Sequence, residues 1–501
     1  MTRVLGHQPA SSSPFLRKRK IPQQNIVSKL LDRELLYCRP GTQFNKTRSL
    51  YTNIVPNLTV VNVEKPPCFL RKFSPDGRFF IAFSADQRAI EVYEFQGPDA
   101  AAHLLQDVKQ DCYGFEGDMA SVYIRTQLFE IFFKLKNRTE VARAGKHLNR
   151  ECSLFTDDCR YLIVASAAFV PDPPHPLYHH VYAHNECIPP GTRFPIEHYT
   201  LHIINLETGV ECDRFDFNFD KIALAHNQGL YLYNNTLAVL SMQKQTIHVF
   251  QITSDGRLVD LRTVGRFCHA DDQLWIASVR DDRVDYAHRE KTINSLKHRL
   301  LVYLYHKAVD MSKLENNLSP LLNFYKYFDQ FEALRMWKMQ LLDENHLLIR
   351  YTHEQLVGQQ STTDPNSAPS FFVVYCLATT KILSVFENTS GELLKLFERF
   401  SDYFRNATLQ NNVQFLCSAS SNMHAQEMHQ RFKDTIVNAK FGGVTESIKR
   451  LLAQLPISAQ SFSSSPYLDL NLYSYDDKWV SVMERPKTCG EHPIRSDFID
   501  T

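Results

Sequence analysis

The sequence predicts a mainly β fold, a WD-repeat-like β-propeller with helical insertions and an N-terminal amphipathic helix. Three observations support this prediction. A Ser-Pro-Asp-Gly turn is followed by two β-rich runs in the first hundred residues. The same order of polar turn and apolar run returns further along the chain, and amphipathic helical patterns interrupt it twice. Turn, buried strand, polar turn and outer strand form the unit that propeller blades repeat.

The stretch Asn62–Tyr93 shows this unit most clearly. In the turn Ser74–Gly77, Pro presets φ, Asp bonds back to the backbone and Gly accepts positive φ. Phe79–Phe83 is a nearly continuous apolar run, as expected of a buried strand. Ile90–Phe95 alternates in part, which is typical of an outer strand. Together these runs predict one blade.

Later segments repeat the order of turn and strand. They lie at Thr156–Ala165, Tyr199–Gly209, Asn234–Phe250, Asp343–Phe386 and Tyr475–Val482. Their spacing is irregular, and long insertions between strands are the simplest explanation. Several small β-sandwiches remain the alternative architecture. On the propeller interpretation, the β body spans residues 50–495.

Composition and charge narrow the class of protein. Hydrophobic residues make up 44% of 501 residues and charged residues 22%, as in a soluble globular protein with a large core. The net charge of +1 argues against a protein that coats nucleic acid. The charge is uneven, because residues 1–50 hold ten Lys or Arg against Asp32 and Glu34. A basic N-terminal arm on a near-neutral body is expected.

The cysteine pattern and the absence of long apolar runs predict where in the cell the protein is located. Eleven cysteines occur without any Cys-x-x-Cys pair, which indicates reduced thiols in an intracellular protein and argues against a RING-type zinc site. No apolar run approaches the roughly 20 residues of a membrane span, and no apolar signal segment opens the chain.

The first forty residues divide into two predicted segments. Residues 1–20 are rich in Ser and Pro and are expected to be a disordered arm. The arm ends in Arg17, Lys18, Arg19 and Lys20, which suit either nuclear import or a solvated charge run. Residues 21–40 contain an amphipathic helix at 24–36, which either packs on its own propeller or inserts into a partner's groove.

Two insertions have helical patterns. Apolar residues near helical spacing run through 292–337, although Leu300–Tyr305 would also suit a strand. In 389–455, Thr389 and Glu392 form a predicted capping box ahead of an amphipathic helix. Further helices follow, the last ending before Pro456. Amphipathic helices inside a β protein usually cap an edge or build a docking surface.

No catalytic signature is present. The chain lacks a Gly-x-Ser-x-Gly elbow, a phosphate-binding glycine loop and a His-Glu-x-x-His motif. The acidic pairs at 157–158, 271–272 and 476–477 precede strands, where Asp favours turns. Metal-ligand types gather at His175, His179, His180, His184 and Cys187. This segment is Pro-rich, and Glu186 is the one acidic residue in it that could support the ligands, so we favour a loop over a metal site.

Six long segments carry a resemblance to a known family. They are Val55–Gly77, 147–160 (HLNRECSLFTDDCR), 294–304, 335–347, 454–461 and 465–490. Over about residues 20–495 the chain resembles the de-etiolated-1 homologue family. The match ends after Arg495, so 496–501 is expected to be an unrelated tail. Family chains continue with further strand sequence, which implies an unpaired sheet edge at the last blade here.

The resemblance implies a nuclear, non-enzymatic, cofactor-free subunit of a cullin-4 ubiquitin ligase. The implied partners are the damaged-DNA-binding-protein-1 adaptor, cullin-4, a small accessory subunit, the constitutive-photomorphogenic-1 ligase and a ubiquitin-conjugating enzyme. Jun-type transcription factors are implied targets. The alternative is a propeller scaffold of another nuclear, chromatin-associated complex.

Within this picture, three sets of residues are predicted sites. The adaptor-docking set is Ile21, Ile26, Val27, Leu30, Leu31 and Leu35. The nuclear import set is Arg17, Lys18, Arg19 and Lys20. From their amphipathic pattern, the 389–455 helices are expected to bind the conjugating enzyme or the accessory subunit through Leu393, Phe397, Phe400, Phe404, Leu451 and Leu452.

Overall fold

The computed structural model describes five stretches of the chain, namely residues 63–105, 119–266, 295–355, 369–404 and 430–458, with short gaps at 144, 171–175, 183, 185, 190–194, 432 and 441. The N-terminal predictions at 1–40, the strand pattern at 475–482 and the tail at 496–501 lie outside these residues. No helix in these stretches is long and apolar enough to cross a membrane.

The described strands form four four-stranded antiparallel sheets, each a meander of consecutive strands. The first sheet holds β1 (Cys68–Phe73), β2 (Phe79–Ser84), β3 (Ala89–Phe95) and β4 (Phe133–Glu140). The second holds β5 (His147–Phe155), β6 (Tyr161–Phe169), β7 (Glu197–Asn205) and β8 (Glu211–Asp220). The third holds β9 (Leu230–Tyr233), β10 (Thr236–Ser241), β11 (Thr246–Ile252) and β12 (Leu258–Val264). The fourth holds β13 (Leu334–Leu341), β14 (His346–His353), β15 (Ser370–Cys376) and β16 (Lys381–Glu387). The described chain is therefore mainly β, as predicted.

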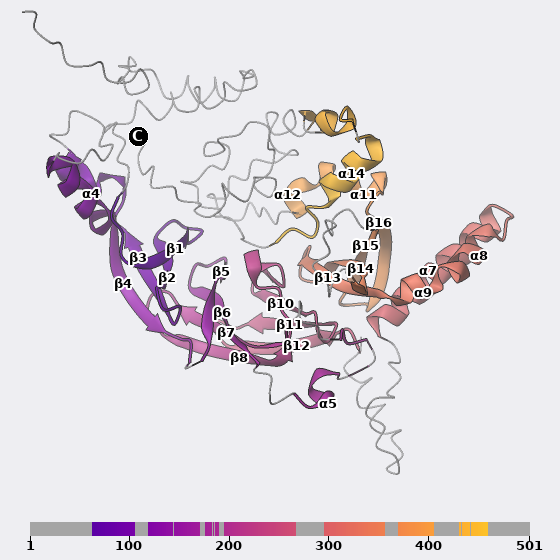
Figure 1. The fold of residues 1–501 in the computed structure, drawn as a ribbon, viewed down its shortest axis with the longest axis horizontal. Helices are drawn as coiled ribbons and strands as arrows, with labels where there is room; N and C mark the ends of the chain where they lie inside the picture. The colour runs from indigo at the N-terminus through magenta and orange to yellow at the C-terminus, as the bar shows by residue number, and fades with distance from the viewer. Residues whose placement is uncertain are drawn as a thin grey trace, which may run out of the picture.

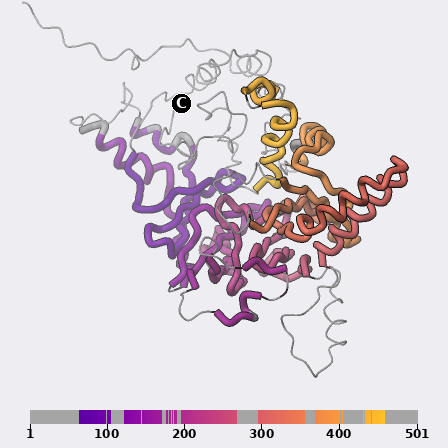
Figure 2. The backbone as a smooth tube through the Cα atoms, turned by 45° about the vertical axis from the view of Figure 1, so that its right-hand side comes forward, coloured from indigo at the N-terminus to yellow at the C-terminus, as the bar shows by residue number. Residues whose placement is uncertain are grey.

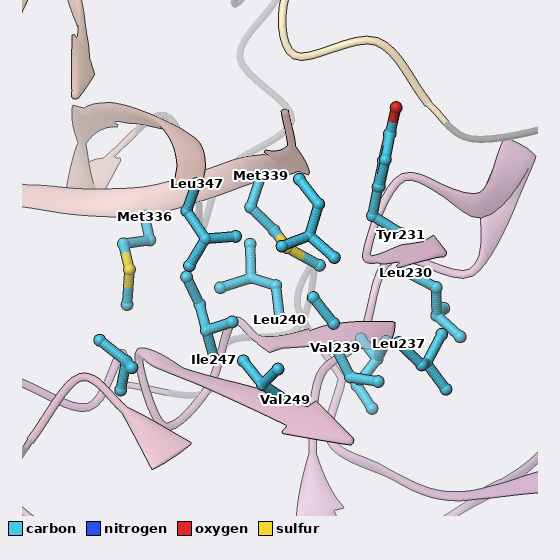
Figure 3. Close-up of a cluster of buried hydrophobic side chains, with 14 of the residues drawn as sticks. Leu230, Tyr231, Leu237, Val239, Leu240, Ile247, Val249, Met336, Met339 and Leu347 are labelled. Carbon is cyan, nitrogen blue, oxygen red and sulfur yellow. The ribbon is translucent and has the colours of Figure 1, made fainter. Parts of the chain in front are cut away.

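The four sheets follow one another in an arc and pack face to face (Figure 1). One core lies between the first and second sheets, and a larger one is continuous through the second, third and fourth. In Figure 3, Met336, Met339 and Leu347 of the fourth sheet face Leu240 and Ile247 of the third. Sheets that are neighbours in sequence thus bury each other's apolar faces.

Stacking on both faces explains why the second strand of each sheet, β2, β6, β10 or β14, is mostly buried. Every residue of β2 and of β10 is buried, because each strand has another sheet or a helix layer on either side. The fourth strands, such as β4 and β12, lie at the perimeter and are largely exposed. Ile90–Phe95, predicted as an outer strand, belongs to the third strand and is mostly buried, so that prediction was wrong. The outer position is taken by β4.

The predicted turns form as their residues require. The Ser74 hydroxyl accepts a hydrogen bond from the Phe79 amide at 2.9 Å, and Gly77 has a φ of +74°. In the second sheet, the Thr156 hydroxyl accepts from the Tyr161 amide at 3.1 Å, which is the same arrangement. Each hydroxyl thereby satisfies the amide that starts a buried strand.

Helices cover the outward faces of the two end sheets (Figure 1). On the first sheet lie η2 (Pro98–Ala101), α3 (Ala102–Leu105) and α4 (Met119–Phe132), whose apolar side chains join those of the sheet. On the fourth sheet lie α11 (Gly391–Arg399), α12 (Ser401–Phe404) and α14 (Val444–Leu452). Two short elements, α5 (Tyr178–Val181) and η3 (Ala225–Asn227), lie in connections of the second and third sheets.

Three further helices are α7 (Leu296–Leu314), α8 (Ser319–Lys326) and α9 (Phe328–Glu332). They lead from the third sheet into β13. Leu300–Tyr305, for which the sequence left helix and strand open, is helical.

Candidate functional site

Exposed apolar side chains concentrate on one element of the described chain. Of 22 large hydrophobic residues that are exposed there, nine lie between residues 302 and 328. They are Val302, Tyr305, Met311, Leu314, Leu318, Leu322, Tyr325, Tyr327 and Phe328. We call α7–α9, residues 296–332, the helical arm. Such a concentration of exposed apolar side chains is typical of an interaction site.

The helical arm projects from the fourth-sheet end of the arc (Figures 1 and 2). Its helices are held to each other by aromatic side chains around the buried Phe324. The Phe324 ring lies 5.7 Å from that of Tyr305 and 5.8 Å from that of Phe331, measured between centroids. The arm therefore contains a small core of its own, at separations typical of stable aromatic pairs.

A second set of apolar side chains on the arm is exposed, although the Tyr325 ring also contacts those of Phe324 and Tyr305, at 5.7 and 6.5 Å between centroids. Leu318, Leu322 and Tyr325 are 66%, 64% and 59% exposed. They follow one another at i, i+4 and i+7, which places them on one side of α8. This spacing is the one that a helix uses when it inserts into a partner's groove.

The base of the arm is fixed to the sheets by its first turn. The Ser295 hydroxyl accepts a hydrogen bond from the His298 amide at 3.0 Å, which caps α7, and donates to Glu186 Oε1 at 2.8 Å. Burial raises the pKa of the Glu186 carboxyl. Leu296 and Leu300 are buried in the large core. The arm thus starts from a fully packed turn.

Lys297 joins the two ends of the arm. Its ammonium group is buried and donates to the backbone carbonyls of Glu332, at the end of α9, and of Leu334, at the start of β13, the latter at 2.8 Å. Burial lowers the pKa of Lys297 to about 8, so the side chain is still mainly protonated at neutral pH. Arg299 adds a hydrogen bond to the Thr380 carbonyl. Both ends of the arm are therefore anchored at its base.

The predicted docking residues of the 389–455 helices lie elsewhere than expected. Leu393, Phe397, Phe404, Leu451 and Leu452 are buried against the outward face of the fourth sheet. A partner could reach them only by displacing the helices, so these five side chains act as core in this structure. The sequence showed that the helices were amphipathic, and this sheet supplies the surface that their apolar faces cover.

The outer side of the same helices does keep some apolar surface. Phe400, the sixth predicted residue, is 48% exposed, and Tyr403 is exposed beside it. Docking at this position therefore stays a prediction, with Phe400 as its residue. The helix start differs by one residue from the prediction, because Ser390, and not Thr389, caps α11 by accepting from the Leu393 amide at 3.3 Å.

Of the other candidate residues, His184 and Asp158 have structural partners, and His175 lies outside the described residues. His184 Nε2 hydrogen-bonds the Lys244 carbonyl at 2.7 Å, and burial lowers the pKa of His184 to about 4. Within the described residues no three His, Cys, Asp or Glu side chains are placed to hold a metal ion. Asp158 accepts from the Arg160 amide at 3.1 Å, as a turn residue does.

The arm's outward face was missed by the sequence reasoning, although a signal existed. The helical pattern of 292–337 includes Phe324 and Phe331, whose rings form the small core, and Phe328, which is 37% exposed. Leu318, Leu322 and Tyr325 mark a second face on the same short helix. A helix with apolar residues on two faces needs two covering surfaces, and the arm itself supplies one.

Comparisons with known proteins identify the family. The model of the family De-etiolated protein 1 Det1 matches residues 150–500, which includes most of the segment expected to be an unrelated tail. The chain is 30% identical over 488 residues to the light-mediated development protein DET1 of Solanum lycopersicum, covering 94% of this chain and 87% of that protein. It is 29% identical over 502 residues to the protein of the same name from Arabidopsis thaliana, covering 94% and 88%.

Similarity to solved structures is weak. The periplasmic gluconolactonase of Pseudomonas aeruginosa matches with 13% identity and a TM-score of 0.21 over 40% of each chain, which supports no statement on fold or function. The family model and the two relatives agree over most of the chain. The chain belongs to the De-etiolated protein 1 (Det1) family.

Proposed function

We propose that this protein is a non-catalytic subunit of a nuclear cullin-4 ubiquitin ligase, joined to the ligase by the damaged-DNA-binding-protein-1 adaptor. Membership of the Det1 family supports this proposal, as does the architecture. Stacked meanders of four strands are the unit of a β-propeller, so we interpret the four sheets as blades. Propellers commonly serve as platforms for partners, and a platform needs no active site of its own.

The helical arm is the structural feature that supports a docking role. It combines a rigid base, through Ser295 and Lys297, with an outward apolar face. A rigid element loses little conformational entropy on binding, so more of its contact energy appears as affinity. Leu318, Leu322 and Tyr325 are the proposed anchors for one protein partner of the ligase. The adaptor itself is proposed to bind the predicted helix at 21–40, outside the described residues.

Reconstitution from purified components tests both assignments. The full chain is mixed with the adaptor, cullin-4, the accessory subunit and a ubiquitin-conjugating enzyme, and the retained subunits are measured by size-exclusion chromatography. Removal of residues 1–40 is expected to release the adaptor and cullin-4. The variant Leu318→Ser/Leu322→Ser/Tyr325→Ser is expected to keep the adaptor and lose one other partner. Retention of every subunit by the triple variant would remove the docking role of the arm.

A matched control uses the helices on the fourth sheet. The double variant Phe400→Ser/Tyr403→Ser changes two exposed aromatic residues at the end of α11 and in α12. Loss of a partner in this variant, and not in the arm variant, would place docking on α11–α12. If the unmodified chain retains neither adaptor nor cullin-4, the ligase proposal itself fails and a scaffold of another nuclear complex takes its place.

A further inference from the structure

A pocket opens on the outward face of the first sheet, at the end of the arc opposite the helical arm. Its volume is about 680 Å³, and it is lined by β3 and β4, by the turn between β2 and β3, and by α4. The α4 helix covers only part of this sheet face. The pocket occupies the part next to Ser84–Asp86 and Pro66–Pro67.

A buried carboxylate lies among the residues that line this pocket. Glu91 is only 8% exposed, although it is ionisable. Its Oε2 accepts a hydrogen bond from the Tyr93 hydroxyl at 2.8 Å. Burial, together with the Glu91 charge, raises the pKa of Tyr93, so the hydroxyl stays protonated and keeps donating. Its other oxygen, Oε1, is 3.9 Å from Arg138 Nη1, which is longer than a hydrogen bond.

The surroundings of Glu91 are apolar and aromatic. Tyr93, Phe129 and Phe133 are each almost fully buried, and all three line the pocket. Such walls lower the local dielectric, which strengthens attraction between the carboxylate and a cation. Aromatic faces add a favourable interaction with the same kind of group. The alkyl part of a long basic side chain would also pack on these rings.

Charges of both signs lie around the opening. Asp86 and Glu130 are exposed acidic residues of the lining, and Lys134 and Arg138 are exposed basic ones. Arg138 is the closest to Glu91, but its side chain is 60% exposed, while that of Glu91 is 10% exposed. Among the described residues, Arg138 is the cation paired with Glu91, at 3.9 Å and from an exposed position. It can turn outward because solvent already surrounds it.

We infer that this pocket binds the cationic side chain of an arginine or lysine on a partner polypeptide, with Glu91 as the counter-ion and the three aromatic rings as walls. Arg138 then acts as an internal competitor, since its guanidinium and the incoming cation would approach the same carboxylate. This site is separate from the helical arm and does not depend on the ligase assignment.

The test is a ligand-observed NMR titration in which capped tripeptides bind to the full-length chain. The probes are acetyl-Gly-Arg-Gly-amide, acetyl-Gly-Lys-Gly-amide and the neutral acetyl-Gly-citrulline-Gly-amide. The arginine or the lysine probe is expected to bind at least about tenfold more tightly than the citrulline probe, which corresponds to about 1.4 kcal/mol. The preference between arginine and lysine identifies the cation. Equal binding of all three probes overturns the inference.

Two variants locate the site. Glu91→Gln keeps an acceptor for Tyr93 and is expected to weaken cation binding about tenfold. Arg138→Gln removes the competitor from an exposed position and is expected to strengthen binding several-fold. Glu344→Gln, an exposed acid at the other end of the arc, is the matched control and should bind as the unmodified chain does. Unchanged binding in Glu91→Gln, or weaker binding in Arg138→Gln, overturns the inference even if one variant folds poorly.

Discussion

The two helical insertions had similar patterns in the sequence and have different positions in the structure. In the 389–455 insertion, Leu393 and Leu451 cover the outward face of the fourth sheet and are buried. In the helical arm, Leu318 and Leu322 are 66% and 64% exposed. An amphipathic pattern therefore predicts that a helix has an apolar face, but not which surface covers that face. The difference separates structural helices from a candidate docking element.

The largest change in stability is expected when a buried leucine of the helices on the fourth sheet is truncated. Leu451→Ala should lower the free energy of unfolding by about 3 kcal/mol, because it leaves a cavity against the fourth sheet. Leu322→Ala, the same change on the arm, should change it by less than about 0.5 kcal/mol. Urea unfolding followed by fluorescence measures both. Equal losses would mean that the arm's outward face is covered in solution.

A smaller effect is expected at the base of the arm. Lys297→Met leaves the carbonyls of Glu332 and Leu334 without their buried donor, at a cost of about 2 kcal/mol. The loss should be local, so hydrogen exchange should speed up in the arm's helices and stay unchanged in the sheets. Lys307→Met, at an exposed position of α7, is the control. Faster exchange throughout the sheets would show that Lys297 supports the whole core instead.

The caps of α11 and α7 allow the stability contributions of single hydrogen bonds in the two insertions to be compared. Ser390→Ala removes only the cap of α11 and should cost about 1 kcal/mol. Ser295→Ala removes the cap of α7 and also the hydrogen bond to Glu186, so it should cost more. Thermal unfolding of the two variants gives the order. A larger loss for Ser390→Ala would contradict the anchoring role of the Glu186 contact.

The pH dependence tests the burial of Lys297 directly. Its pKa is about 8 in the folded protein against 10.5 for an ordinary lysine. Between these values the unfolded chain binds more protons, so this group adds stability as the pH rises, about 1 kcal/mol from pH 8 to 9. Lys297→Met should lack that contribution. Urea midpoints of both proteins at pH 8 and 9 measure the difference, and identical pH slopes would show that Lys297 is solvated.

Local patterns predicted much of the sheet structure. Phe79–Phe83 and Leu237–Leu240 are continuous apolar runs after polar turns, and both became the central buried strands of meanders. The turn residues Ser74 and Thr156 act through hydrogen bonds that span five positions, which lie within reach of a local sequence rule. These features depend on residues that are close together in the chain, so local sequence patterns are enough to predict them.

Features that depend on distant neighbours were not predicted. Met119–Phe132 has many residues that suit strand or helix, and it became α4 because a helix there covers the outward face of the first sheet. Ile90–Phe95 was placed at the wrong position in its sheet because 37 residues, 96–132, lie between Phe95 and β4, and these include α4. No local pattern records such a contact.

The sequence alone therefore determined the mainly β class, the turns, the buried central strands and the resemblance to the Det1 family. The tertiary structure decided which apolar helix faces became core and which stayed on the surface. It also placed Glu91 among aromatic rings and joined Lys297 to the far end of the arm. The physical reason is the same in each case: a side chain's own chemistry is local, whereas its burial is set by the elements that long-range packing brings to it.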